Sequence, residues 1–135
     1  MKVKKILGID YGEKRIGLAI ADNVLRLALP KGYVKCESLA LAVKKIETLC
    51  SEWEIEKIVI GMPLELSGKE SEFQKKAQNF ILELKKKISI SIEWQDERLT
   101  TKAAQKLLKG QKRSKEHIDA LSAQIILQTY LDQKK

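Results

Sequence analysis

Acidic residues stand at three places in the sequence where they could share a metal ion. Asp10 ends a short apolar run that predicts a buried strand, and Asp96 and Glu97 follow a segment with the alternating pattern of a strand. Asp119 lies on the apolar side of a predicted C-terminal helix. Carboxylates from separate elements suit hard divalent cations such as Mg²⁺ or Mn²⁺. Two such cations about 4 Å apart can hold both the attacking and the leaving oxygen of a phosphodiester. The pattern therefore indicates a metal site suited to phosphodiester chemistry.

Each acid also has a simpler interpretation. Asp10 could be a turn aspartate bonded to nearby backbone groups, and Asp96 and Glu97 could be loop acids with Arg98 as a weak surface partner. Asp119 could lie at the boundary of the apolar face, neutralised by a lysine or an arginine. We favour the metal interpretation for Asp119 because it follows the first helical turn, where capping no longer explains a carboxylate. An unpaired carboxylate on a buried face is also costly.

The spacing of apolar residues predicts the elements that carry these acids. Strands are expected at 3–9, 15–21, 25–36, 57–60 and 88–94, and helices at 38–53, 73–84, 100–108 and 114–131. The first three strands should be antiparallel, and the later strands should join by right-handed crossovers. The expected fold is an α/β domain, a mixed five-stranded sheet flanked by helices. Ligands of such sheets collect outside the carboxyl ends of the strands, so strands that point the same way would bring their acids together.

The charge distribution indicates a polyanionic partner. The chain carries 26 lysines and arginines against 18 aspartates and glutamates, a net charge of +8. Between 98 and 117 only Glu116 is acidic, whereas seven residues there are basic: Arg98, Lys102, Lys106, Lys109, Lys112, Arg113 and Lys115. Nucleic-acid binding is expected of five of them and of two residues in the turn after the first strand: Arg98, Lys109, Lys112, Arg113, Lys115, Lys14 and Arg15. His117, the single histidine, is expected on the helix surface rather than in proton transfer.

Cysteine usage and hydropathy set the expected location of the protein. Cys36 and Cys50 lack the spacing of metal ligands and indicate reduced thiols. No apolar run approaches the roughly 18 residues that cross a membrane, and the run before Asp10 is too short for a signal peptide. We therefore expect a cytoplasmic protein with no membrane partner.

Four motifs of the chain resemble one known family from end to end. They are GIDYGEKRIGLAIAD at 8–22, IVIGMPLELSG at 58–68, DERLTT at 96–101 and IDALSAQIILQTYL at 118–131. In this order they resemble the YqgF family, also called RuvX-like proteins, which have a ribonuclease H-like fold. Members are bacterial proteins described as nucleases of pre-16S ribosomal RNA and, earlier, as Holliday junction resolvases. The resemblance implies a single nuclease domain over 1–135.

The resemblance also implies roles for individual residues. Asp10, Glu97 and Asp119 would be the catalytic acids, and Asp96 would join them as a candidate ligand of Mg²⁺ or Mn²⁺, with the choice between Asp96 and Glu97 open. Many ribonuclease H-like enzymes carry a glutamate on the fourth strand instead, but here that strand, KIVIGMP, has no acid. Two departures from the family concern substrate contacts. The link between DERLTT and IDA is shorter than expected, and ELSG stands at 65–68 where a form closer to Asn-Met-Asp-Gly is expected.

Three functions remain open at this point. The resemblance ranks a nuclease that processes the 5′ end of pre-16S ribosomal RNA first, and a resolvase of branched DNA second. The basic stretch alone would also suit a nucleic-acid-binding module without catalysis. A resolvase needs a symmetric dimer to cut two strands, whereas an RNA-processing enzyme can act as a monomer. A monomer or a weak homodimer is therefore expected.

Overall fold

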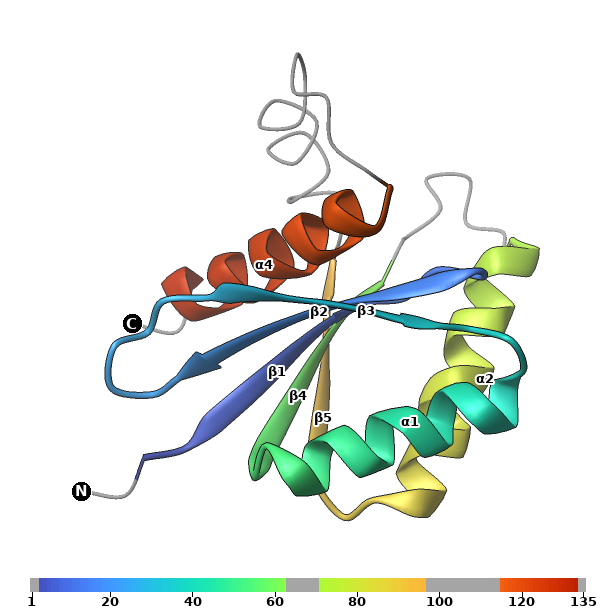
Figure 1. Cartoon of the computed structure of the whole chain (residues 1–135), viewed down its shortest axis with the longest axis horizontal. Coiled ribbons are helices and arrows are strands. Elements are labelled where there is room, and N and C mark those ends of the chain that lie inside the picture. Colours follow the sequence, from blue (N-terminus) through green and yellow to red (C-terminus); the bar gives the residue numbers. More distant parts are fainter. Residues whose placement is uncertain (1–2, 63–70, 97–114, 134–135) are drawn as a thin grey trace.

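A computed structural model describes residues 3–62, 71–96 and 115–133 of the chain. The strands of this part are β1 (Lys5–Asp10), β2 (Arg15–Asp22), β3 (Leu29–Lys35), β4 (Ile55–Met62) and β5 (Ser91–Asp96). Its helices are α1 (Leu39–Glu52), α2 (Glu72–Lys87) and α4 (Lys115–Gln133). The sheet lies between the helices, with α4 on one face and α1 and α2 on the other (Figure 1). The helix expected at 100–108 lies outside the described residues.

The sheet is mixed and five-stranded, as the sequence predicts. Its strand order is β3-β2-β1-β4-β5, in which β2 is antiparallel to both β3 and β1, and β4 is parallel to both β1 and β5. Asp10 pairs with Gly61, and Gly61 pairs with Gln95. Strands β1, β4 and β5 therefore point the same way and end at one edge of the sheet.

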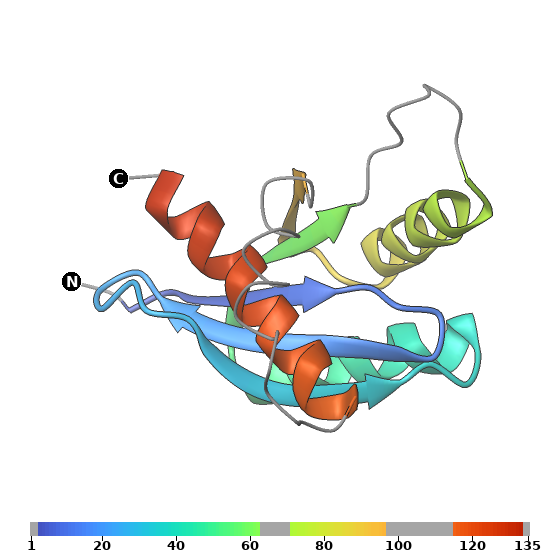
Figure 2. The ribbon, with the colours of Figure 1, turned by 90° about the horizontal axis from the view of Figure 1, so that it is seen from above.

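The two faces of the sheet carry two separate apolar cores. Leu7 and Ile9 of β1 pack with α1 and α2, whereas Ile6 packs with the buried side of α4. Since side chains alternate along a strand, residues 6, 8 and 10 share the face that α4 covers. Seen from above, α4 runs across the antiparallel half of the sheet (Figure 2).

Small residues let α4 lie unusually close to this face. A methyl group at Gly8 would come within 2.7 Å of Leu127 Cβ, and one at Gly17 would come within 2.0 Å of the Asp119 carbonyl oxygen. Ala19 and Ala21 continue the same face of β2 and are buried. The glycines thus fix where α4 rests on the sheet, and with it the position of Asp119.

Serine side chains cap the two helices on the other face. Ser38 Oγ accepts a hydrogen bond from Leu41 N at 3.2 Å, and Ser71 Oγ accepts one from Gln74 N at 3.0 Å. Such caps satisfy backbone donors that the first helical turn leaves open. None of the helices in the described ranges is long and apolar enough to cross a bilayer.

The third strand is shorter than its sequence pattern predicts. It begins at Leu29 rather than at 25, because Asp22 Oδ1 accepts hydrogen bonds from the backbone of Val24 and Leu25 and folds this segment into a turn. Arg26 continues the turn with a φ of 55°. Gln128 of α4 then accepts a hydrogen bond from Ala28 N at 2.9 Å. Contacts with α4 therefore hold this segment in place.

Candidate functional site

Asp10 occupies the last position of β1. Its register partners are Gly17 on β2 and Gly61 on β4, neither of which has a side chain that could cover it. The alternation along β1 directs its side chain to the face that α4 covers. A carboxylate in this place stands on a rigid strand, and the chain turns away immediately after it.

Asp119 reaches the same place from α4. Its carbonyl group lies against Gly17, which is the register partner of Asp10. One helical turn later, the Ala123 carbonyl lies 3.2 Å from a methyl group built at Gly8. The helix therefore crosses from β2 to β1, with Asp119 over the register partner of Asp10. The structure brings these two predicted site residues to the same face and the same end of the sheet.

Arg15 is the partner of Asp119 in this structure. Its Nε donates a hydrogen bond to Asp119 Oδ2 at 2.7 Å, and both side chains are about one-quarter exposed, at 26% and 24%. This is the neutralised arrangement that the simpler interpretation of Asp119 expects. It also gives Arg15, a predicted phosphate contact, a role within the protein. Burial of this order permits a stronger pair than a fully exposed one.

The third predicted acid lies at the end of β5. Asp96 is the last residue of that strand and pairs with Met62 of β4, while Glu97 lies outside the described residues. Two strand spacings separate β5 from β1, about 10 Å between backbones. Among the residues that the structure describes, no three carboxylate, histidine or cysteine side chains gather into a metal-binding group. The described part therefore supplies two carboxylates on the α4 face, those of Asp10 and Asp119. It also gives the backbone position of a third acid, Asp96, at the end of β5.

The chemistry of these donors fits a hard divalent cation. Asp10 and Asp119 offer carboxylate oxygens, which Mg²⁺ and Mn²⁺ prefer. Gly61 beside Asp10 carries no side chain, whereas the backbone of Asp119 fills the space next to Gly17. Arg15 already provides one positive charge at this point, so a divalent cation would have to compete with it for the Asp119 carboxylate.

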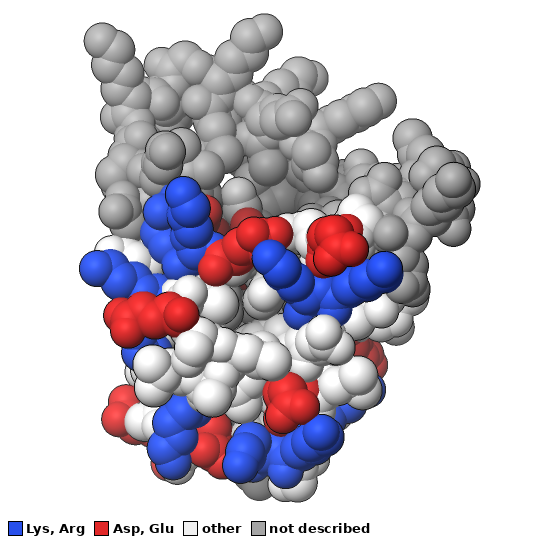
Figure 3. All heavy atoms as spheres, turned by 90° about the vertical axis from the view of Figure 1, so that its right-hand side faces the viewer, with Lys and Arg blue, Asp and Glu red and all other residues white. Residues whose placement is uncertain are grey.

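Most predicted nucleic-acid contacts lie outside the described ranges. These are Arg98, Lys109, Lys112 and Arg113. Lys14 lies exposed in the turn between β1 and β2, and Lys115 and His117 lie in the first turn of α4. Figure 3 looks onto the end of the molecule where β1 ends, and acidic and basic side chains lie next to one another on it. The described part of this end is mixed in charge rather than uniformly basic.

A polar cluster at the other end of α4 was not predicted from the sequence. Lys57 Nζ donates hydrogen bonds to Tyr130 Oη at 2.9 Å and to Glu93 Oε1 at 3.2 Å. The bond to Tyr130 raises the pKa of Lys57, and burial raises the pKa of Tyr130. This cluster ties α4 to β4 and β5. Because the same helix carries Asp119, the cluster helps to fix the helix that positions the acid.

Small residues on one face of the sheet are the signal that could have revealed the helix position. Gly8 on β1 and Gly17, Ala19 and Ala21 on β2 face α4. Their alternation with large apolar residues marks a face that another backbone approaches closely. Local sequence patterns do not show which element covers this face. They also do not show that Arg15 pairs with Asp119.

Comparisons with known proteins agree with the motifs. The family model described as RuvX, Holliday junction resolvase, matches residues 4–133. A protein of Syntrophomonas wolfei named "Putative pre-16S rRNA nuclease" is 36% identical over 132 residues, 95% of this chain and 94% of its own. A protein of Sulfurihydrogenibium with the same name is 42% identical over 134 residues, covering 96% of this chain and 91% of its own.

Solved structures show the same fold at low sequence identity. The RuvC protein of Thermus thermophilus in complex with a Holliday junction substrate aligns with a TM-score of 0.62 and 15% identity, over 97% of this chain and 95% of that one. The Holliday junction resolvase of fowlpox virus aligns with a TM-score of 0.60 and 12% identity, over 96% of this chain and 99% of that one. The predicted ribonuclease H-like fold is thereby confirmed.

Proposed function

Because the chain belongs to the RuvX family, a family of nucleases, we propose that it processes the 5′ end of pre-16S ribosomal RNA by metal-dependent hydrolysis of a phosphodiester bond. The observation that carries the proposal is the position of Asp10 and Asp119, on the same face and at the same end of the sheet. Arg15 neutralises Asp119 in the metal-free protein, and the shared place of the two carboxylates supports a site for a divalent cation there.

Each group of residues would have its own role in this reaction. Asp10, Asp119 and either Asp96 or Glu97 would hold Mg²⁺ or Mn²⁺, which would activate a water molecule and stabilise the charge on the leaving oxygen. Gly17 admits the backbone of α4 and so brings Asp119 beside its own register partner, Asp10. Arg15 pairs with Asp119 through a 2.7 Å hydrogen bond and would give up this carboxylate to the cation. Asp10, Glu97 and Asp119 are the proposed catalytic residues.

Basic residues would bind the RNA beside this site. Arg98, Lys109, Lys112, Arg113 and Lys115 belong to a stretch of strong positive charge, and Lys14 lies exposed next to Asp10 in sequence. Such residues bind phosphates without reading base sequence. We propose that the enzyme acts in the cytoplasm, as a monomer or a weak homodimer.

Cleavage of branched DNA is the second candidate function. The description of the family model as a Holliday junction resolvase is the observation that favours it. A resolvase must cut two strands symmetrically and therefore acts as a dimer. Ribosomal RNA ranks first because the relatives with 36% and 42% identity carry that substrate in their names.

The test combines a cell depleted of this protein with cleavage by the purified protein. Depletion should leave 16S ribosomal RNA with an unprocessed 5′ end, and the purified protein with Mg²⁺ or Mn²⁺ should cut a leader–16S RNA at the mature end. An Asp10→Asn variant should fail in both settings. A four-way DNA junction serves as the competing substrate. Symmetric cleavage of the junction without cleavage of the RNA would favour the second function, and Asp10-dependent Mn²⁺ binding would separate either enzyme from a non-catalytic module.

A further inference from the structure

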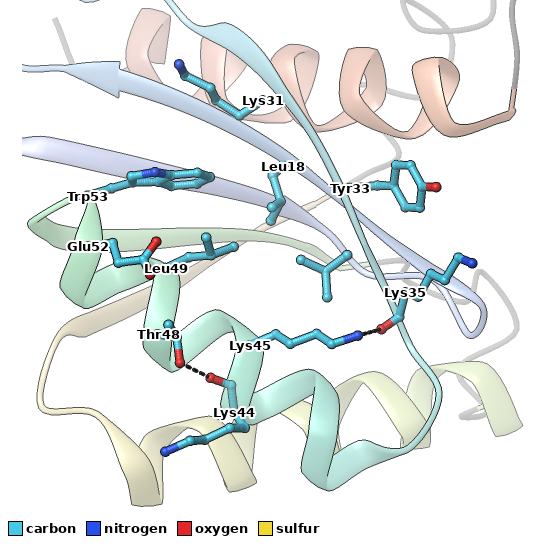
Figure 4. A pocket seen from close by; sticks show the side chains of 11 residues that line it. Leu18, Lys31, Tyr33, Lys35, Lys44, Lys45, Thr48, Leu49, Glu52 and Trp53 are labelled. Carbon is cyan, nitrogen blue, oxygen red and sulfur yellow. Dashed lines mark hydrogen bonds between the residues drawn. The ribbon is translucent and has the colours of Figure 1, made fainter.

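A groove of about 590 Å³ lies between β3 and α1, on the face of the sheet opposite α4 (Figure 4). Its floor consists of Leu18 and Val34, which are buried in the core, and of Leu49 from α1. Pockets that hold small ligands commonly have volumes of roughly 300–1,000 Å³. The groove is thus large enough to hold part of a ligand, and it lies outside the candidate metal site.

The rim of the groove is basic. Four lysines line it, Lys31, Lys35, Lys44 and Lys45, and the single acid among the lining residues is Glu52. Lys44 is already paired, because its Nζ lies 3.4 Å from Glu47 Oε1. Lys45 Nζ lies 3.5 Å from the Lys35 carbonyl oxygen rather than next to a carboxylate.

Lys35 is the register partner of Arg15, which bonds to Asp119 on the α4 face, so the Lys35 side chain lies on that face and only its carbonyl group reaches the groove. Within the described part of the chain, neither Lys31 nor Lys45 has an acidic partner in ion-pair distance. These charges favour an anionic ligand.

An indole ring stands at one end of the groove. Trp53 ends α1 and packs against the core with only part of its surface. Figure 4 shows Trp53 above Leu49 and Glu52, while Tyr33 and Lys35 lie at the other end. A flat aromatic surface next to lysines is the combination by which proteins hold unpaired nucleotides, since the ring stacks on a base and the cations face the phosphates. An acidic peptide would use the lysines but would have no need of the ring.

The groove is continuous with the candidate active site through the edge of the sheet. Lys35 is the register partner of Arg15, whose side chain bonds to Asp119. Strand β3 is the edge strand, so no further strand blocks the way from the α4 face to the groove. From Lys45 to Trp53 the groove follows about 12 Å of helix at 1.5 Å per residue. This length suits a short run of nucleotides.

We propose that the groove between β3 and α1 binds a single-stranded segment that continues from the strand being cut, with phosphates near Lys31 and Lys45 and a base against Trp53. The proposal deepens the proposed function and rests on it for the identity of the nucleic acid. Through this groove the protein would distinguish a substrate with a single-stranded flank from a blunt duplex.

Binding measurements without metal test this proposal apart from catalysis. The probe is a fluorescent ten-nucleotide RNA without secondary structure, measured by anisotropy in EDTA with Asp10→Asn protein. The double variant Lys31→Gln/Lys45→Gln should bind about tenfold more weakly, and the slope of log affinity against log salt should fall by about 1.4, which is 0.7 for each lost contact. The matched control is Lys85→Gln/Lys86→Gln, which removes the same charge from α2 outside the groove and should keep the original slope.

Substitutions of the ring separate stacking from charge. Trp53→Leu should weaken binding about fivefold or more without changing the salt slope, whereas Trp53→Phe should retain most of the affinity. If Trp53→Leu fails to fold, the lysine pair still decides the question. Equal slopes for the groove variant and the α2 control would overturn the proposal, and so would an equal loss of affinity for a blunt duplex of the same length.

The outcomes also separate this proposal from the proposed function. If the wild-type protein cuts neither RNA nor four-way DNA while the groove variants lose RNA binding, the groove stands and the nuclease assignment fails. If cleavage occurs and the groove variants bind like the control, the groove assignment fails alone. Competition by polyglutamate that displaces the RNA equally from wild-type and Trp53→Leu protein would point to a peptide site and overturn the proposal.

Discussion

Arg15 Nε donates a hydrogen bond to Asp119 Oδ2 at 2.7 Å and so joins the start of β2 to the first half of α4, across 104 residues of sequence. The pair lies beside Asp10, because Gly17 on β2 is the register partner of Asp10 and touches the backbone of Asp119. An arginine and a divalent cation would compete for the same carboxylate. The pair thus links the stability of the metal-free protein to its metal affinity.

Replacing Asp10 by asparagine should remove cleavage and leave the fold intact. We expect the rate to fall about 100-fold or more, which corresponds to about 2.7 kcal/mol of activation free energy, because the amide cannot supply the negative charge that holds the cation. Asp132→Asn, near the exposed end of α4, is the matched control and should cut normally. Wild-type cleavage rates in Asp10→Asn protein with a native circular dichroism spectrum would contradict the assignment.

Replacing Arg15 by glutamine should strengthen metal binding. Loss of the nearby positive charge favours a cation at Asp119, and we expect Mn²⁺ to bind roughly three- to tenfold more tightly, which corresponds to about 0.6–1.4 kcal/mol. Isothermal titration of wild-type, Arg15→Gln and Lys14→Gln proteins checks this, with Lys14 as the exposed neighbouring control. Weaker Mn²⁺ binding in Arg15→Gln alone would mean that Arg15 orients Asp119 for the cation instead.

The same pair makes a prediction about the metal-free protein. In a double-mutant cycle with Arg15→Gln and Asp119→Asn, the coupling free energy should be about 0.2–1 kcal/mol, since both side chains are partly exposed. The sequence alone leads us to expect that Asp119→Asn would not destabilise the metal-free protein, because repulsion from Asp10 is removed. The observed ion pair opposes that gain, so a small net loss is now expected in chemical unfolding experiments.

Replacing Gly17 by alanine should destabilise the protein and disturb the site together. A methyl group there would meet the Asp119 carbonyl oxygen at 2.0 Å, a contact with backbone that no side-chain rotation relieves. We expect a loss of about 3 kcal/mol or more in the free energy of unfolding. Gly32→Ala is the control, because it has open space around it and a φ of 82°, so backbone strain of about 1–2 kcal/mol is its only cost. Equal losses for both variants would show that α4 moves away freely.

Stability should fall in alkaline solution as the buried thiol of Cys50 titrates. Burial raises the pKa of Cys50 from 9.0 to about 11. The unfolded chain therefore loses this proton at a lower pH than the folded protein does. The stabilisation that the protonated thiol provides is fully present below pH 9 and is lost as the pH rises to about 11. Two pKa units correspond to about 2.7 kcal/mol. Urea unfolding at pH 8 and pH 11 should show a smaller decline for Cys50→Ala than for wild type, and parallel declines would exclude this thiol as a cause.

The basic stretch should set substrate affinity even though it lies largely outside the described residues. Replacing Lys109, Lys112, Arg113 and Lys115 with glutamine should weaken binding and flatten its salt dependence. Each lost contact should reduce the log–log slope by about 0.7 for a single strand or about 0.9 for duplex DNA. An unchanged slope, measured by anisotropy across a salt series, would place the path of the phosphates elsewhere.

Local patterns in the sequence determined most of the elements and the edge of the sheet at which Asp10 and Asp96 end their strands. The period of two in β1 and the helical period in α1 and α4 depend on neighbouring residues alone, so strand, helix and the terminal position of Asp10 follow from them. The boundary of β3 did not follow, because the side chain of Asp22 folds the preceding segment into a turn. Family motifs supplied the roles of Asp10 and Asp119, which periodicity cannot assign.

Only the tertiary structure decided which residues meet across the sheet. The pairing of Arg15 with Asp119, the cluster around Lys57 and the groove between β3 and α1 each join segments far apart in sequence. Their geometry depends on how closely α4 and α1 approach the sheet. Gly8 and Gly17 set that approach for α4 by leaving no side chain in its way. A sequence pattern shows that a residue is small. Which backbone segment packs against that residue depends on the packing of the whole domain.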